Sequence, residues 1–148
     1  MPRSQPIVSG CIFCQIVSGE APCFEVYRDD HVVVFMDLFP VAVGHTLVVT
    51  REHFENLFEA TPEALAGVTT ASRRVAQAIR AELAPAGLGV YQLNGAAAGQ
   101  TVFHYHMHLI PRGEGDSLRL HGRSRGDATQ LSDLAQRLHR ALEPSPGT

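Results

Sequence analysis

The sequence has little charge, no long hydrophobic run and few cysteines. Charged residues make up 18% of the 148 residues and the formal net charge is −3, so there is no reason to expect a nucleic-acid scaffold protein. No segment approaches the roughly 20 apolar residues of a membrane span, and residues 1–10 lack the apolar stretch of a signal peptide. We therefore expect neither a membrane nor a nucleic-acid partner, and we expect a cytoplasmic location.

The three cysteines are Cys11, Cys14 and Cys23. An odd number of cysteines in a reducing compartment argues against a disulfide framework. Cys11 and Cys14 have the two-residue gap of zinc ligands, although two ligands do not close a tetrahedral site. The pair is thus a candidate metal clip, and the alternative is that both are small buried hydrophobic residues.

Length and patterning predict one domain with an α+β fold. We expect a flexible arm at residues 1–10, a single domain at 11–143 and a flexible tail at 144–148. Strands are predicted at 25–28, 32–36, 46–50, 89–94 and 102–110. A long helix begins at Thr61 and Pro62 and stops before Pro85, and a last helix begins at Asp127. This order predicts an antiparallel sheet with both helices packed on one face.

Three of the eight histidines occupy alternate positions, at His104, His106 and His108. On a strand they share one face, and the residues between them point into the core. Their proximity disfavours charging all three rings, so at least one stays neutral near pH 7. A neutral imidazole held by a hydrogen bond at its other nitrogen is a nucleophile or a base. The alternatives are a chance surface cluster and a metal site.

A glycine-rich loop precedes the histidines. Asn94 ends one predicted strand, and Gly99, Gln100 and Thr101 lead into the next. Glycines let backbone N–H groups approach an anion, and the polar side chains add donors without fixed charge. The loop is therefore a candidate phosphate cradle, and a turn without a ligand is the alternative.

The stretch from Gly99 to His108 resembles the signature of the histidine triad (HIT) family, in which Gln-Ser or Gln-Thr precedes His-x-His-x-His. Three further segments resemble bacterial members, so the likeness covers about Cys11 to Arg112; they are Cys11-Ile12-Phe13-Cys14, Asp37 with Pro40, and 44–49. Family membership implies a homodimer in which central strands pair across the two copies.

The resemblance implies a nucleotide hydrolase or transferase acting on a purine nucleoside phosphoramidate or a dinucleoside polyphosphate. His106 is the implied nucleophile, which forms a nucleotidyl-histidine, and His108 hydrogen-bonds the α-phosphate. His45 lies near the phosphate without an assigned role. The implied nucleotide contacts are Asn94, Gly99, Gln100 and Thr101 for the phosphate, Asp37 for the ribose, and Ile12, Phe13, Phe35 and Leu38 for the base. Plain core packing is the alternative for Phe13, Phe35 and Leu38.

Bacterial members complete a zinc site with two histidines, which correspond to His53 and His104. The resemblance therefore implies structural zinc held by Cys11, Cys14, His53 and His104. The chemistry itself needs no metal, because a neutral His106 is already nucleophilic.

The sequence does not decide between the two substrate classes. Thr101 stands where the phosphoramidase branch usually has Ser and the polyphosphate branch commonly has Thr, and the Trp-Pro-Pro-Gly ending of the phosphoramidase branch is missing. Arginines after the triad either reach a second phosphate or form a solvated basic loop; they are Arg112, Arg119, Arg123 and Arg125. The alternatives to an enzyme are a non-catalytic nucleotide-binding module on the same fold and a zinc-storage or zinc-dependent regulatory protein.

Overall fold

The computed structural model describes residues 8–142. Its elements are, in chain order, α1 (Ile12–Ser18), β1 (Glu25–Arg28), β2 (Val32–Met36), β3 (Thr46–Thr50), α2 (Pro62–Leu83), β4 (Gly87–Tyr91), the 3-10 helix η1 (Ala96–Ala98), β5 (His106–Arg112) and α3 (Ala128–Leu142). The predicted tail lies outside the described residues. The predicted arm lies mostly outside them, and its last residues form a turn before α1, in which Cys11 N donates to Val8 O.

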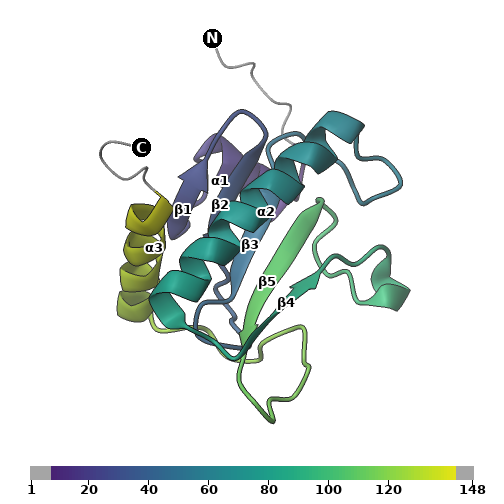
Figure 1. Ribbon diagram of the computed structural model, residues 1–148. Coiled ribbons are helices and arrows are strands. Elements are labelled where there is room, and N and C mark those ends of the chain that lie inside the picture. Colours follow the sequence, from purple (N-terminus) through teal and green to yellow (C-terminus); the bar gives the residue numbers. More distant parts are fainter. Residues whose placement is uncertain (1–7, 143–148) are drawn as a thin grey trace.

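All five strands pair antiparallel in the order β1-β2-β3-β5-β4. The long helix α2 and the C-terminal helix α3 cover one face of this sheet, and α1 covers part of the other (Figure 1). The α+β class, the antiparallel sheet and the two predicted helices are therefore confirmed. Among residues 8–142, no helix combines the length and apolar character needed to cross a bilayer.

The central strands are buried on both faces, and every residue of β2 and β3 is buried. Alternate residues of β2 point to opposite sides. Val34 packs against α2 and α3, whereas Val33 and Phe35 pack against α1. Two cores thus share one sheet, which is why these strands read as continuous apolar runs.

Helix α1 was not predicted from the sequence, and the expectation of helices on one face only is incomplete for that reason. Seven residues are too few for a clear helical period. Its N-cap is also unusual, because the Cys11 thiol accepts the hydrogen bond from Cys14 N at 3.3 Å. The thiol is outside the usual set of capping side chains, so no start signal was visible.

The two strands nearest the predicted site have different bounds from those expected. β4 ends at Tyr91 instead of position 94, and β5 begins at His106 instead of position 102. Local polar contacts replace the sheet ladder in both places. Tyr105 N donates to Phe54 O at 2.7 Å, and Gln92 and Asn94 bond to each other through their side chains. His104 therefore precedes the strand and does not belong to it.

Candidate active site

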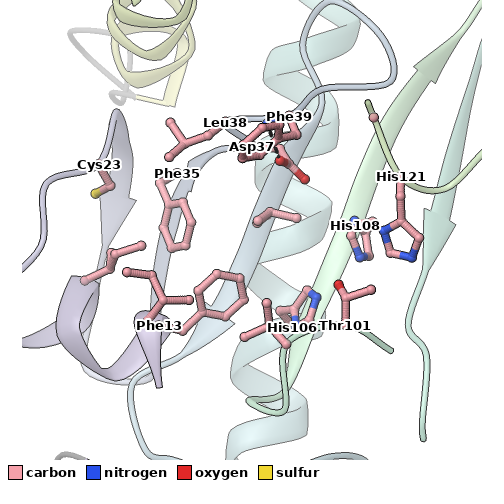
Figure 2. A pocket seen from close by; sticks show the side chains of 15 residues that line it. Phe13, Cys23, Phe35, Asp37, Leu38, Phe39, Thr101, His106, His108 and His121 are labelled. Atoms are coloured by element: carbon pink, nitrogen blue, oxygen red, sulfur yellow. Dashed lines mark hydrogen bonds between the residues drawn. The ribbon is translucent and has the colours of Figure 1, made fainter. Parts of the chain in front are cut away.

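A cavity of about 380 Å³ opens on the α1 side of the sheet, over the ends of β3 and β5. Figure 2 shows Phe13 and Phe35 at one end of it, Thr101 and His121 at the other, and His106 between. Eight of the predicted nucleotide-binding residues line the cavity: Ile12, Phe13, Phe35, Asp37, Leu38, Thr101, His106 and His108. Three are not among its lining residues: Asn94, Gly99 and Gln100.

The apolar end of the cavity is built from aromatic rings in edge-to-face contact. The rings of Phe13 and Phe35 are 5.5 Å apart at 76°, and the rings of Phe13 and His106 are 4.9 Å apart at 90°. Phe13 and Phe35 also belong to the core beneath α1. Phe13 and Phe35 therefore both pack in the core and line the pocket, and this packing makes the pocket wall rigid.

His106 has one ring nitrogen engaged and one free. Its Nδ1 lies 2.6 Å from His104 O, and a carbonyl only accepts, so Nδ1 carries the proton. Nε2 is left as a bare lone pair on a ring that lines the cavity. Burial lowers the pKa of His106, although the bond to the His104 carbonyl and the charge of Asp37 act in the opposite direction. The ring is thus held neutral with a bare Nε2, the state in which an imidazole can act as a nucleophile.

A hydrogen-bond chain sets the proton position on His108. Val41 N donates to Nδ1 of His45 at 3.1 Å, so His45 carries its proton on Nε2. That Nε2 lies 3.0 Å from Nδ1 of His108 and 3.3 Å from Oδ2 of Asp37. His108 therefore accepts at Nδ1 and carries its own proton on Nε2.

The Nε2 atom of His108 is buried and has no hydrogen-bond partner among the described residues. A buried donor left unpaired costs about 1–3 kcal/mol, which an anionic ligand in the cavity offsets. Burial lowers the pKa of His45 to about 4, and burial together with the neighbouring histidines lowers the pKa of His108 to about 3. Both rings are neutral at pH 7, so His108 is a neutral donor beside the nucleophile.

Asp37, His45 and His108 also bring potential metal-ligand atoms together. Binding through Nε2 of His45 would require that atom to lose its proton. The proton would then move to Nδ1, where it would face the Val41 N–H donor. We therefore interpret the three side chains as a hydrogen-bond chain.

The residues of the predicted phosphate cradle form hydrogen bonds with other parts of the protein. Gln100 accepts from Gly95 N at 2.7 Å and donates to Glu55 O at 2.6 Å. Asn94 accepts from Leu57 N at 2.8 Å. Gly99 adopts a φ of 101°, which favours glycine. These residues shape the loop before His104, and their direct contact with a nucleotide stays a prediction.

The predicted metal ligands converge on one point outside the cavity. The Sγ atoms of Cys11 and Cys14 lie 3.3 Å and 3.6 Å from Nδ1 of His104, and Nδ1 of His53 lies 3.2 Å from the same atom. Bond lengths to tetrahedral Zn²⁺ place neighbouring ligand atoms about 3.3–3.8 Å apart. His104 Nε2 donates to Thr50 O at 2.7 Å, the outer contact typical of metal-bound histidine. The donor set and spacing thus fit zinc.

Seven residues that line the cavity were not predicted from the sequence, and His121 is the histidine among them. His121 lines the pocket from the loop after β5, and its Nε2 lies 2.8 Å from Gly99 O. No spacing rule connects it to the triad, because tertiary contacts set the path of this loop. Arg112, by contrast, donates to the carbonyls of Ser117 and Arg119 and is not a lining residue.

Three comparisons with known proteins fit this geometry. The chain is 45% identical over 125 residues to "Protein hit" of Bacillus subtilis (strain 168), covering 84% of this chain and 86% of the relative. It is 35% identical over 116 residues to "Adenylylsulfatase HINT3" of Arabidopsis thaliana, covering 78% and 59%. The crystal structure of a "ZN-bound histidine triad family protein" from Mycobacterium smegmatis superposes with a TM-score of 0.79 at 37% identity, covering 90% and 93%.

The family profile described as "HIT domain" matches residues 18–115, which contain all three triad histidines and most of the sheet. This match spans more than half of the chain, and the Bacillus relative matches over 125 residues, which are 84% of this chain. The chain belongs to the histidine triad family.

Proposed function

We propose that this protein is a nucleotide hydrolase or transferase that acts at the α-phosphorus of a purine nucleoside phosphoramidate or dinucleoside polyphosphate, through a nucleotidyl-His106 intermediate. The observation that carries this proposal is the presence of two complementary ring nitrogens in one cavity. The bare Nε2 of His106 and the unpaired Nε2–H of His108 line the same cavity. One is a nucleophile and the other is a neutral donor for a phosphate oxygen.

In the first step, His106 Nε2 attacks phosphorus and the bond to the leaving group breaks. The ring becomes positively charged, and its Nδ1–H bond to the His104 carbonyl stabilises that charge. His108 donates to a non-bridging oxygen as negative charge develops there. A single donor of this kind contributes about 3–4 kcal/mol to other acyl and phosphoryl transfers.

The nucleoside is held by residues that are already fixed. Asp37 accepts from Phe39 N at 2.8 Å through Oδ1, so its carboxylate has one orientation available for ribose hydroxyls. Phe13 and Phe35 offer aromatic surface to the base, which suits a purine because every base has a π-face. Binding and positioning thus precede the chemistry.

We also infer that structural zinc is held by Cys11, Cys14, His53 and His104. When bound, the ion supplies a cross-link between the start of α1, the loop after β3 and the segment that leads into β5. The carbonyl of His104 orients His106, so this cross-link fixes the acceptor that selects the nucleophilic nitrogen. No chemical step requires the metal.

A homodimer is part of the proposal. β4 lies at one edge of the described sheet, and Val90 on it is 52% exposed. An edge strand with an exposed apolar side chain is suited to pairing with a second copy. Light scattering of the wild type should give the mass of two chains, and Val90→Lys should shift the mass toward one.

The test is mass spectrometry after rapid quenching, with adenosine phosphoramidate, diadenosine tetraphosphate and adenylyl sulfate as substrates. The last is included because one relative is named an adenylylsulfatase. We expect an adenylyl adduct on the peptide that contains His106, and relative rates across the panel identify the substrate class. Tight AMP binding without adduct or product from any substrate would instead favour a non-catalytic nucleotide-binding module.

A further inference from the structure

The loop between β5 and α3 brings a third histidine ring to the cavity, beside His106 and His108. His121 lines it, and its ring centre is 5.9 Å from that of His108. Figure 2 shows His121 beside His108 and Thr101, at the end away from Phe35. The base slot and His121 therefore lie on opposite sides of the nucleophile, so the group that leaves phosphorus has its natural place near His121.

The loop that carries His121 is anchored on both sides of that residue. Gly122 packs so closely on the 39–40 backbone that a Cβ there would lie 2.2 Å from Phe39 O. Gly126 N donates to Leu38 O at 2.7 Å, and the Arg112 guanidinium binds carbonyls earlier in the loop. The imidazole is thus positioned by the fold, with its Nε2–H donated to Gly99 O.

With a phosphoramidate substrate, the proposed reaction needs a proton on the leaving nitrogen that the inner rings do not supply. An amine or alkoxide leaves phosphorus readily only when it is protonated as the bond breaks. Burial keeps the pKa of His45 at about 4 and that of His108 at about 3, so neither ring carries an acidic proton at neutral pH. His121 is exposed, and its Nδ1 has no partner among the described residues.

We propose that His121 is the general acid that protonates the leaving group and the general base that activates water in the second step; this rests on the proposed function. In the first step the Nε2–phosphorus bond of His106 forms, and the bond to the leaving group breaks. Its electron pair stays on the leaving atom, which takes the Nδ1 proton of a doubly protonated His121 and leaves that ring neutral with its Nε2–H on Gly99 O. In the second step water attacks phosphorus and gives its proton to His121, and the electron pair of the breaking bond returns to His106.

The experiment compares two adenosine 5′-phosphate derivatives in wild type and His121→Gln. An alkyl amidate needs a proton on its leaving nitrogen, whereas a p-nitrophenyl ester releases a stable anion without one. For His121→Gln we expect the amidate rate to fall about 100-fold. The rate of the p-nitrophenolate burst, which reports the first step alone, should not change. The steady-state rate after the burst should fall, because the attack of water lacks its base.

Gly122→Ala is the second variant, because its Cβ would lie 2.2 Å from the Phe39 carbonyl oxygen and so displace the loop that carries His121. It should show the same selectivity between the two substrates. His31→Gln is the matched control, since His31 is an exposed histidine that does not line the cavity. It should leave both substrates unaffected, and thermal unfolding of each variant checks that the fold is retained.

Equal loss on both substrates, including the burst, would overturn the proposal, because it would indicate a packing role. An unchanged amidate rate would overturn it as well, because the proton would come from elsewhere. If wild type forms neither product nor adduct from either derivative, the proposed function itself fails.

Discussion

Two histidine clusters meet in one short segment, and they differ in which ring nitrogen is available. His104 donates from Nε2 to Thr50 O and presents Nδ1 to the two cysteines. His106, two residues later, donates from Nδ1 to His104 O and presents Nε2 to the cavity. The two rings therefore have opposite tautomers, although they belong to the same motif.

The difference shows that backbone carbonyls assign the chemistry of each ring. A ring nitrogen that meets a carbonyl carries the proton, and the other nitrogen becomes the ligand or the nucleophile. In the cysteine cluster the free atoms converge within 4.8 Å of one another, which suits an ion. In the pocket cluster they line a cavity of about 380 Å³, which suits a phosphate ester.

The strongest test of this contrast removes the pocket nucleophile. His106→Asn should reduce turnover of the best substrate by at least about 10⁴-fold, because the covalent intermediate cannot form. AMP affinity, measured by calorimetry, should change little, since the aromatic slot and His108 remain. Turnover near the wild-type rate in this variant would contradict the proposed mechanism.

The matching test removes a ligand from the other cluster. Cys14→Ser should reduce the zinc content from one ion per chain to none, and it should lower the melting temperature by about 10 °C, because metal binding contributes to folding. Cys23→Ser is the control, because Cys23 is outside the cluster and should keep the ion. Several zinc ions per wild-type chain would support a storage role instead.

A smaller effect is expected from the residue that positions His108. His45→Phe removes both the acceptor for Val41 N and the donor to His108, so we expect kcat to fall about 100-fold with little change in KM. His45→Gln offers an oxygen and an N–H in a similar arrangement and should recover part of the loss. Equal losses in the two variants would indicate that His45 acts by packing alone.

The smallest effect is a pH dependence of stability. Burial lowers the pKa of His45 from 6.5 to about 4 in the folded state, with Asp37, His108 and Arg112 as its charged and titratable neighbours. The unfolded chain therefore binds more protons between these values, and the free energy of unfolding falls as pH falls through this window.

Replacing His45 should weaken this dependence of the unfolding free energy on pH. Between pH 6 and 5, chosen to lie inside the window from 6.5 to about 4, His45→Gln should lower the slope of the unfolding free energy by up to about 1.4 kcal/mol per pH unit. Urea titrations at several pH values measure this slope. Parallel curves for the variant and the wild type would contradict the assignment of a neutral, buried His45.

Many of the helices and strands were predictable because their sequence signals are local. Thr61 caps α2 and Pro62 begins it, as expected from two adjacent residues. The apolar runs of β2 and β3 have the expected bounds, and Met107 and Leu109 pack against the opposite core from His106 and His108. The missed features lack such signals. A thiol caps α1, polar contacts end β4 early, and a loop carries His121 back to the cavity.

By itself, the sequence determined that His106 and His108 share one face of a strand, since that pattern depends only on backbone period, and that two thiols stand three positions apart. Only the tertiary structure decided which nitrogen of His104 and of His108 is available. Those choices depend on the Thr50 carbonyl and on the Val41 N–H that orients His45, which are brought to the triad from elsewhere in the chain. A ring's two nitrogens are equivalent in sequence, and only a neighbour in space distinguishes them.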